Sequence, residues 1–388
     1  MKKPFCLMAK PVGSSCNLQC RYCYYSDKSW GQPSKMCEET LSSYIRQYIE
    51  VQPADEVSFL WHGGEPTLLS LDFYKHVVEL QARFAGHKRI TNCLQTNGTL
   101  LNDSWCEFFS KNKWLIGLSI DGPAAHHNRF RHDKCGNSTF DTVMDGIRLL
   151  KKHGVEWNAM ATINSLNVTH PHQFYSFFKE IGAEFIQFTP IVERFTSAGR
   201  LAAVDEKGTI TNMSVSPEAW GEFLITLFDI WRKNDIGKIF IQIFDAVLAN
   251  HLGMEPGVCS LATHCGSCPV IDSDGSIYTC DHFVFPQYKI GNINGSSLKS
   301  LVYSEKLLEF GQSKTTSLPS ECKSCRYLKL CNGECPKNRF MTDCHGQPGM
   351  NYLCKGYKLF FEHSEEFFEN MAANIRMQMS KSHYKHEY

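Results

Sequence analysis

The sequence predicts an α/β protein in which a partial barrel of parallel strands is followed by a cysteine-rich domain. Two observations predict this architecture. Six apolar, strand-like runs alternate with amphipathic helical runs between residues 5 and 188. Ten of the 18 cysteines then lie from Cys259 onward. We therefore expect a partial barrel over residues 1–235 and a second domain, ending in a C-terminal helix, over residues 236–388.

The first half alternates strands and helices at the spacing of βαβ units. Its strands are nearly continuous apolar runs, which is typical of parallel strands covered by helices. The expected strands are 5–12, 57–61, 90–94, 115–120, 155–163 and 185–188. The expected helices are 38–50, 71–84, 104–111, 140–153 and 171–181. Six units are too few for a closed eight-stranded barrel, so we expect a partial (β/α)6 barrel with its chemistry at the C-terminal strand ends.

The middle of the chain is less regular. Residues 193–213 are rich in Gly, Thr, Ser and charged residues, which predicts a loop that is either a solvated linker or an excursion facing a partner. Residues 217–233 carry an apolar stripe typical of a core helix, and 239–252 are also expected to be helical. A turn signal within 272–280 predicts a hairpin of two short strands.

Composition limits the classes of function. Lys plus Arg and Asp plus Glu both total 40, and this balance argues against a nucleic-acid or anionic-membrane surface. No apolar run approaches the ~18 residues of a membrane span. The N-terminus, Met1-Lys2-Lys3-Pro4, lacks the pattern of a signal peptide, so we expect a cytoplasmic protein. Cytosolic thiols stay reduced, so clustered cysteines indicate metal ligands rather than disulfides.

Three thiols, Cys16, Cys20 and Cys23, follow the first strand at the spacing Cys-x3-Cys-x2-Cys. Thiolates are the ligands of iron–sulfur clusters. Three of them would leave one iron of a four-iron cluster open, much as catalytic zinc keeps an open position. The alternatives are a zinc loop or three unrelated core cysteines. The next Cys-x2-Cys unit is distant, at Cys265 and Cys268, so we favour a cluster with an open iron.

Polar and glycine-rich segments end the next three strands, at 62–66, 95–98 and 119–123. Gly63 and Gly64 would let the backbone approach a ligand closely, although a Gly-Gly pair alone is also typical of a plain turn. All three segments lie where a barrel of parallel strands places its active site.

Cys-x3-Cys-x-aromatic-Cys after the first strand, with Gly-Gly-Glu-Pro after the second, resembles the radical S-adenosylmethionine (SAM) enzymes. In that family the open iron binds the amino and carboxylate groups of SAM, which is cleaved to methionine and a 5′-deoxyadenosyl radical. The resemblance implies SAM contacts from Tyr22, Gly63, Gly64, Glu65, Ser119, Arg131 and Ile186. Core packing is the alternative for Tyr22 and Ile186, and a strand-end cap or surface ion pair for Ser119 and Arg131.

The C-terminal cysteines have a spacing that indicates metal binding, and the spacing alone fits both zinc and iron–sulfur clusters. The block resembles the SPASM module of peptide-modifying radical SAM enzymes, which holds two auxiliary four-iron clusters. The resemblance implies two ligand sets: Cys259, Cys265, Cys280 and Cys335, and then Cys322, Cys325, Cys331 and Cys354. The total is three [4Fe-4S] clusters. Cys268 and Cys344 are left over, and Cys344 is the better rival for a ligand position.

Over about residues 5–370 the chain resembles the anaerobic sulfatase-maturating enzymes. The matching segments are 9–11, 61–66, 94–98, 186–188, 280–284 and 331–337. The resemblance implies oxidation of one Cys or Ser in a sulfatase's Cys/Ser-x-Pro/Ala-x-Arg motif to Cα-formylglycine (3-oxoalanine), with 5′-deoxyadenosine and methionine as co-products. It implies Asp281 as the catalytic base and Tyr25 and Gln95 as substrate contacts. His62 and His282 adjoin these positions, and we expect structural roles for them.

The resemblance further implies two partners. One is an unfolded or nascent sulfatase polypeptide, and the other is an electron donor such as flavodoxin or ferredoxin; no nucleic acid or membrane partner is expected. Two alternatives remain. One is another SPASM enzyme that forms a thioether or carbon–carbon crosslink in a peptide. The other is a zinc-binding interaction protein that has kept the fold.

Overall fold

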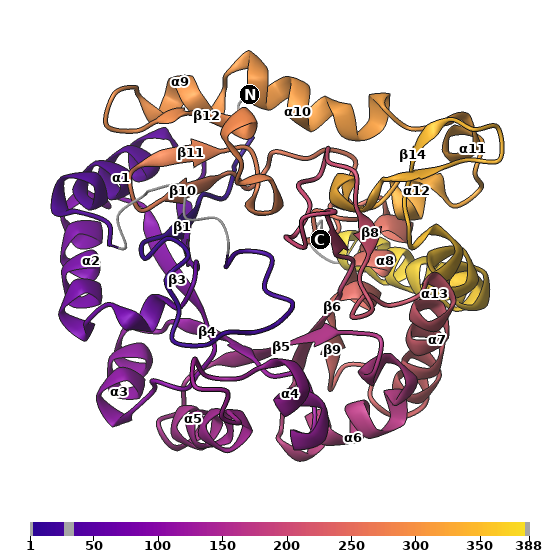
Figure 1. Cartoon of the computed structure of the whole chain (residues 1–388), viewed down its shortest axis with the longest axis horizontal. Coiled ribbons are helices and arrows are strands. Elements are labelled where there is room, and N and C mark those ends of the chain that lie inside the picture. Colours follow the sequence, from indigo (N-terminus) through magenta and orange to yellow (C-terminus); the bar gives the residue numbers. More distant parts are fainter. Residues whose placement is uncertain (1–2, 27–34, 385–388) are drawn as a thin grey trace. The chain divides into compact units, whose positions relative to one another are not determined.

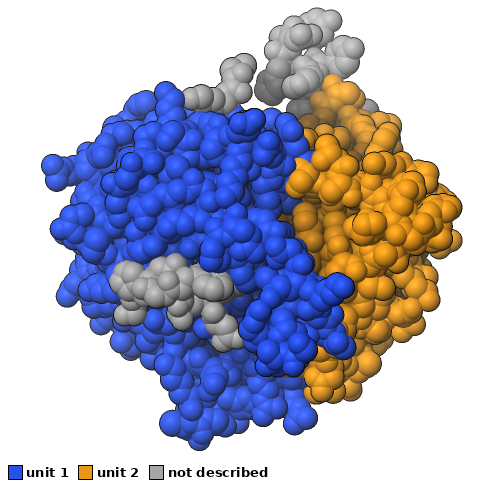
Figure 2. Space-filling model, turned by 45° about the horizontal axis from the view of Figure 1, so that its top comes forward, with its two compact units in different colours: residues 1–161, 193–209, 265–312 blue, residues 162–192, 210–264, 313–388 orange. Residues whose placement is uncertain are grey.

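The structure is a computed structural model, and it describes residues 3–26 and 35–384 (Figure 1). The chain forms two compact units, coloured separately in Figure 2. Unit 1 comprises residues 1–161, 193–209 and 265–312, and unit 2 comprises residues 162–192, 210–264 and 313–388. Each unit takes segments from both halves of the sequence, so the expected boundary after residue 235 stays a prediction. No helix in the described part of the chain has the length and apolar character of a membrane span.

Unit 1 is built on a mainly parallel sheet. Its strands β1 (Met8–Lys10), β2 (Glu56–Trp61), β3 (Arg89–Thr96), β4 (Leu115–Ser119) and β5 (Trp157–Ile163) pair in this order, all parallel. The last two residues of β5 are assigned to unit 2. On its other side β1 pairs in parallel with β10 (Val270–Asp272). The sheet continues antiparallel through β11 (Ser276–Tyr278) and β12 (Lys289–Asn292), as Figure 1 shows beside β1. The predicted hairpin is thus confirmed, and it extends the sheet next to the first strand.

Helices pack along this sheet with one apolar face buried. They are α1 (Glu38–Val51), α2 (Leu71–Phe84), α3 (Asp103–Asn112), α4 (Ala124–Phe130), α5 (Phe140–Lys152) and α9 (Leu298–Val302). In α1 the buried side chains include Leu41, Tyr44, Ile45 and Tyr48, which is the predicted stripe. Tyr44 meets Trp61 of β2 edge to face, with ring centroids 5.8 Å apart. The sequence predicted these helices except α4 and α9.

Unit 2 holds the parallel pair β6 (Phe185–Pro190) and β9 (Phe240–Ile241) and the longest helix of the described chain. Its helices are α6 (Pro171–Glu180), α7 (Pro217–Asn234), α8 (Gln242–Leu252), α11 (Ser320–Lys323), α12 (Leu328–Cys331) and α13 (Cys354–Tyr384). Helices α7 and α13 touch at glycines: a Cβ atom on Gly356 would lie 2.0 Å from the Pro217 carbonyl oxygen. The predicted core helix at 217–233 is confirmed, and the one at 239–252 begins with a short strand.

Several short elements complete the chain. Helix α10 spans Glu305–Thr316. The 3₁₀ helices are η1 (Pro66–Leu68), η2 (Asn167–Thr169), η3 (Asp281–Phe283), η4 (Pro286–Tyr288) and η5 (Pro336–Asn338). The remaining strands are β7 (Arg194–Phe195), β8 (Thr209–Ile210), β13 (Met341–Thr342) and β14 (Pro348–Met350).

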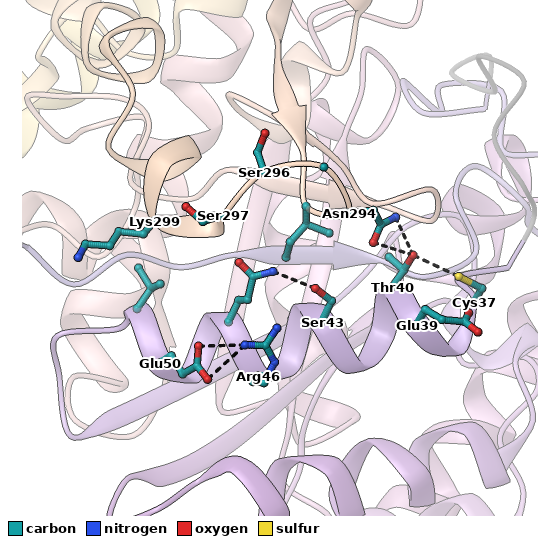
Figure 3. A pocket seen from close by; sticks show the side chains of 14 residues that line it. Cys37, Glu39, Thr40, Ser43, Arg46, Glu50, Asn294, Ser296, Ser297 and Lys299 are labelled. Carbon is teal, nitrogen blue, oxygen red and sulfur yellow. Dashed lines mark hydrogen bonds and ion pairs between the residues drawn. The ribbon is translucent and has the colours of Figure 1, made fainter.

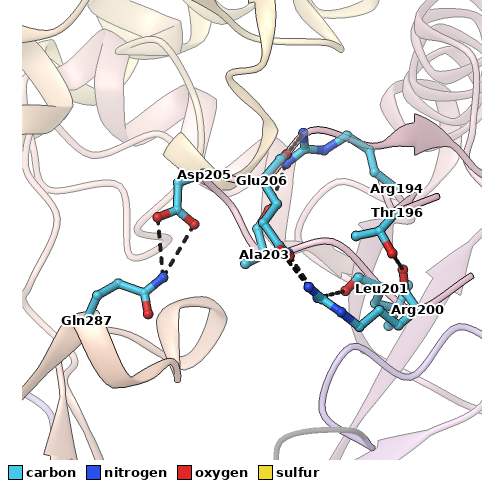
Figure 4. A network of polar contacts seen from close by, with 8 residues as sticks. All are labelled: Arg194, Thr196, Arg200, Leu201, Ala203, Asp205, Glu206 and Gln287. Carbon is cyan, nitrogen blue, oxygen red and sulfur yellow. Dashed lines mark hydrogen bonds and ion pairs between the residues drawn. The ribbon is translucent and has the colours of Figure 1, made fainter. Parts of the chain in front are cut away.

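The predicted loop after residue 193 is folded around a buried arginine (Figure 4). The Arg194 guanidinium donates to the carbonyl oxygens of Glu206, at 2.7 Å, and Val204, at 2.9 Å. The Glu206 carboxylate forms an ion pair with Arg200 and accepts a 2.8 Å hydrogen bond from the Ala203 amide. Because these backbone groups are satisfied within the segment, residues 194–206 form an ordered loop, and the choice between a solvated linker and an excursion facing a partner stays open.

Candidate active site

The three-cysteine loop is held by backbone hydrogen bonds to residues at the end of α4 and just after it. The amides of Gln19 and Arg21 donate to the carbonyls of His132 and Phe130, at 2.8 and 3.0 Å. Burial raises the pKa of the Cys20 thiol to about 12; Arg131 opposes this rise, while Cys23 and Cys16 add to it. Three neighbouring thiolates would repel one another unless cations lay between them. The cationic irons of an iron–sulfur cluster would hold all three as thiolates, so the residues fit such a cluster.

Cys16 has hydrogen-bond donors around its sulfur. The Leu18 amide lies 3.3 Å from Sγ, and Asn97 Nδ2 lies 3.9 Å from it. Asn97 also donates to Asn17 Oδ1 at 2.9 Å, so the end of β3 is tied to the cysteine loop. Within residues 3–26 and 35–384, no three or more His, Cys, Asp or Glu side chains converge around a single metal ion.

The Gly63-Gly64 turn packs against the residues that precede Cys16. Gly63 has φ +123°, in the region that favours glycine, and a Cβ atom on Gly64 would lie 1.8 Å from the Ser15 carbonyl oxygen. The amides of Gly64 and Glu65 donate to the carbonyls of Gly13 and Ser15, both at 2.8 Å. Only glycine fits this approach, so the structure brings the predicted turn to the cysteine loop.

Glu65 uses its side chain to join the ends of two strands. Its carboxylate accepts hydrogen bonds from Thr67 N at 3.0 Å, Thr96 Oγ1 at 2.7 Å and Asn97 N at 2.7 Å. The carboxylate therefore braces the loop after β2 against the end of β3. Its predicted contact with SAM stays a prediction.

Tyr22, Asp121 and Arg131 form a buried polar cluster beside Cys20. The Tyr22 hydroxyl donates to Asp121 Oδ2, and Arg131 Nη1 donates to the Tyr22 oxygen at 2.9 Å. Arg131 is only 8% exposed, and its Nε atom has no hydrogen-bond partner among the described residues. A buried guanidinium with an unused donor fits an anionic group such as the SAM carboxylate.

The other predicted cofactor and substrate positions are also located. Gln95 Nε2 donates to Ser119 Oγ at 3.0 Å, so these two predicted residues touch at neighbouring strand ends. Tyr25 is buried in unit 1, where its hydroxyl donates to Asp272 Oδ2 at 3.2 Å. Ile186 is buried on β6 of unit 2. These contacts do not test the predicted roles.

Asp281 lies at the start of η3, among charged and aromatic groups of unit 1. Lys10 Nζ is 2.5 Å from Asp281 Oδ1, and the Tyr24 hydroxyl donates to Oδ2. Burial would raise the pKa of Asp281, but Lys10, His62 and His282 outweigh burial and hold that pKa below its usual range. The carboxyl group is therefore ionised. Burial, aided by Lys10, lowers the pKa of His62 to about 4, so this histidine is neutral.

Sequence reasoning assigned no role to Lys10 or Tyr24, although both bind the predicted base. Lys10 stands in the Ala-Lys-Pro segment before the cysteines, and Tyr24 directly follows Cys23. Only the position of these two residues in or beside the matching motifs could have indicated a role. Their types gave no such indication, because a lysine at a strand end is usually exposed.

In unit 2, four of the C-terminal thiols lie near enough for charge on one to affect the pKa of another. Burial raises the pKa of Cys331 to about 12, and the charges of Glu334, Cys354 and Cys322 raise it further. Burial also raises the pKa of Cys354 to about 11; Lys358 opposes this, and Cys322 and Cys325 add to it. These four cysteines are one predicted ligand set. The other set is divided between the units, with Cys265 and Cys280 in unit 1 and Cys259 and Cys335 in unit 2, and stays a prediction.

Of the two leftover cysteines, Cys268 hydrogen-bonds the Cys6 thiol and thereby lowers the pKa of Cys6. Cys344 is exposed. A polar pocket of about 1070 Å³ also lies in unit 1, between α1 and the turn after β12 (Figure 3). The described residues that line it, such as Thr40, Arg46 and Asn294, include none of the predicted site residues.

Comparison with known proteins decides the family. Residues 11–178 match the radical SAM superfamily, and residues 259–326 match an iron–sulfur cluster-binding domain. The chain is 51% identical over 387 residues to the serine-type anaerobic sulfatase-maturating enzyme of Bacteroides thetaiotaomicron, covering 97% of this chain and 94% of that one. This chain belongs to the anaerobic sulfatase-maturating enzymes. It is a radical SAM enzyme that uses SAM and iron–sulfur clusters.

Two further matches support the assignment of this chain to the anaerobic sulfatase-maturating enzymes. The cysteine-type enzyme of Clostridium perfringens is 36% identical over 380 residues, covering 96% of this chain and all of that one. A solved structure of native anSMEcpe with bound AdoMet and the Cp18Cys peptide has a TM-score of 0.86 and 36% identity, covering 96% of this chain and 100% of that chain. The α/β fold class, with radical SAM and SPASM domains, is thereby confirmed.

Proposed function

We propose that this enzyme oxidises one Ser or Cys of a sulfatase polypeptide to Cα-formylglycine. The observation that carries the proposal is the identity of 51%, almost end to end, with an enzyme named for sulfatase maturation. The buried, ionised Asp281 in unit 1 supports it, because such an oxidation requires a base near the target side chain. The target is a Cys/Ser-x-Pro/Ala-x-Arg motif in an unfolded or nascent chain.

The oxidation removes a hydrogen atom, a proton and an electron from the target side chain. Bound SAM and a reduced cluster would supply the radical that takes the hydrogen atom. This chain's own residues bind and position the reactants and accept the proton. Asp281 accepts the hydroxyl or thiol proton, Arg131 binds the carboxylate of SAM, and Tyr25 and Gln95 contact the peptide. Flavodoxin or ferredoxin supplies electrons in the cytoplasm.

The cysteines divide into three ligand sets in this proposal. Cys16, Cys20 and Cys23 hold the cluster with the open iron. The mutual interaction of the thiols in unit 2 supports the set Cys322, Cys325, Cys331 and Cys354. Cys259, Cys265, Cys280 and Cys335 would hold the remaining cluster, and an auxiliary cluster would supply an acceptor for the electron that leaves the target.

A serine target is favoured. The serine-type relative is 51% identical and the cysteine-type relative 36% identical, each over nearly the whole chain. The test is anaerobic incubation of the reconstituted enzyme with SAM, a reductant and two peptides that differ only in Ser or Cys at the target. Mass spectrometry should show the Ser peptide losing the mass of two hydrogens. This should be faster than the reaction of the Cys peptide, which loses two hydrogens and also replaces its sulfur by oxygen. Faster conversion of the Cys peptide would reverse the preference, and conversion of neither would remove the proposed function.

A further inference from the structure

We propose that Lys10 is a positioning residue of this oxidation: its ammonium group fixes the Asp281 carboxylate and the Tyr25 ring in their working positions. The inference rests on the proposed function, because it concerns the base that the oxidation uses. Nothing in the sequence assigned Lys10 a role.

Burial sets Lys10 apart from most lysines. Its side chain is 0% exposed, and lysine is almost never fully buried unless it is paired. The ammonium lies 2.5 Å from Asp281 Oδ1 and 3.8 Å from the centroid of the Tyr25 ring. A cation over an aromatic face, paired on its other side with a carboxylate, holds both groups in one geometry.

The backbone of Lys10 is anchored on both sides. Lys10 is the last residue of β1 and pairs with Asp272 of β10, while the neighbouring Ala9 pairs with Trp61 of β2. The His62 amide donates to the Ala9 carbonyl at 2.8 Å, and the Gly13 amide to the Lys10 carbonyl at 3.0 Å. Sites built on strands are more precise than sites on loops, so β1 is a rigid support for the ammonium.

Each oxygen of the Asp281 carboxylate has its own partner. Lys10 forms an ion pair with Oδ1, and the Tyr24 hydroxyl donates a hydrogen bond to Oδ2. With both oxygens engaged, the plane of the carboxylate is fixed. Asp272 is a second carboxyl group near the ammonium, and it accepts a hydrogen bond from the Tyr25 hydroxyl at 3.2 Å. The single ammonium group of Lys10 thus contacts both the proposed base, Asp281, and the proposed peptide contact, Tyr25.

The chain offers a matched control outside the site. Lys179 Nζ lies 2.9 Å from Asp235, and the Tyr175 hydroxyl donates to the same carboxylate at 2.8 Å. This Lys–Asp–Tyr group in unit 2 has the same chemistry as the group of Lys10, Asp281 and Tyr24. Lys179→Met removes an ion pair of the same chemistry, on a lysine that is 43% exposed, and should leave the oxidation unchanged.

The experiment compares Lys10→Met, Lys10→Arg and Lys179→Met in the reconstituted enzyme with SAM, dithionite and a sulfatase-motif peptide. Formylglycine and 5′-deoxyadenosine are measured together, with iron content and thermal melting as checks on the fold. For Lys10→Met we expect formylglycine to fall about 10–100-fold, as on loss of a residue that orients a functional group. Formation of 5′-deoxyadenosine should continue in Lys10→Met, so the ratio of 5′-deoxyadenosine to formylglycine should rise. In Lys10→Arg this ratio should return part of the way to the wild-type value.

Undiminished formylglycine in Lys10→Met would overturn the inference. An equal loss of formylglycine, 5′-deoxyadenosine and iron would also overturn it. If wild type makes no formylglycine, the proposed function fails instead. Should Lys10→Met not fold, a double variant decides, because Lys10→Met with Asp281→Asn removes the charges of both members of the buried pair. If Lys10 acts through Asp281, the double variant makes as much product as Asp281→Asn alone. A further loss of product would contradict the inference.

Discussion

At the scale of single residues, Asp281 is the proposed base. Its carboxyl is ionised, and both oxygens bind donors. We predict that Asp281→Asn still cleaves SAM to 5′-deoxyadenosine but forms about 10²–10⁴-fold less formylglycine, the usual contribution of a general base. Product and 5′-deoxyadenosine are measured in the same anaerobic reaction. Normal product formation would remove Asp281 from the mechanism.

His127 makes stability depend on pH. Its Nδ1 accepts the Asp121 amide at 3.3 Å, and burial, with a smaller effect of Arg131, lowers its pKa from 6.5 to about 2. Below pH 6.5 His127 binds a proton in the unfolded chain but not in the folded chain. The free energy of unfolding therefore falls as the pH drops below that value. The expected slope from this residue is about 1.4 kcal/mol per pH unit.

Denaturant unfolding of the protein between pH 6.5 and 5 tests this. His127→Gln keeps a hydrogen-bond acceptor without a titrating ring, so its stability should fall less steeply than that of wild type. His87→Gln, at an exposed position, is the control and should keep the wild-type slope. An unchanged slope in His127→Gln would contradict the prediction.

At the scale of elements, the contact between α7 and α13 depends on the absence of a side chain. A Cβ atom on Gly356 would lie 2.0 Å from the Pro217 carbonyl oxygen, which is backbone and cannot rotate away. We predict that Gly356→Ala destabilises the protein by about 1–3 kcal/mol, the range for overpacked sites. It should also lower iron content, because Cys354 stands two residues earlier. Gly295→Ala, in open space, is the control for denaturant unfolding.

The loop of residues 194–206 depends on one arginine. Arg194 is buried and donates to three backbone carbonyls of that loop. We predict that Arg194→Met makes this loop the earliest site of limited proteolysis, since those carbonyls lose their donors. Arg200→Met, which removes an exposed ion pair, should change cleavage much less. Equal cleavage of both variants would contradict this account.

The elements also show what sequence could predict and why. Helices such as α1 and α7 followed from the spacing of their own apolar residues, a local signal. The pairing of β1 with β10 joins residues about 260 apart, as Met8 with Val270, and no local pattern reports it. Thiol spacing pointed to Cys16, Cys20 and Cys23 for the same local reason. The roles of Lys10 and Tyr24 around Asp281 required the fold, because burial and the meeting of β1 with η3 are tertiary features.

At the scale of the whole molecule, the three proposed clusters should be separable. Cys16→Ala should lose about a third of the iron, one four-iron cluster, and all cleavage of SAM. Cys322→Ala should lose a similar amount of iron while SAM is still cleaved. Cys135→Ser, at an exposed and unassigned cysteine, should keep the wild-type iron content. Loss of far more than one cluster from Cys16→Ala would contradict the ligand sets. Iron and sulfide analysis of the anaerobic proteins gives the answer.

The proposed oxidation depends on removal of a hydrogen atom from the target side chain by a radical derived from SAM. The most direct measurement uses a sulfatase-motif peptide with deuterium at the target Cβ, incubated anaerobically with the enzyme, SAM and a reductant. We predict that deuterium appears in 5′-deoxyadenosine while the peptide becomes formylglycine. Formylglycine formed beside unlabelled 5′-deoxyadenosine, or no 5′-deoxyadenosine at all, would contradict the account.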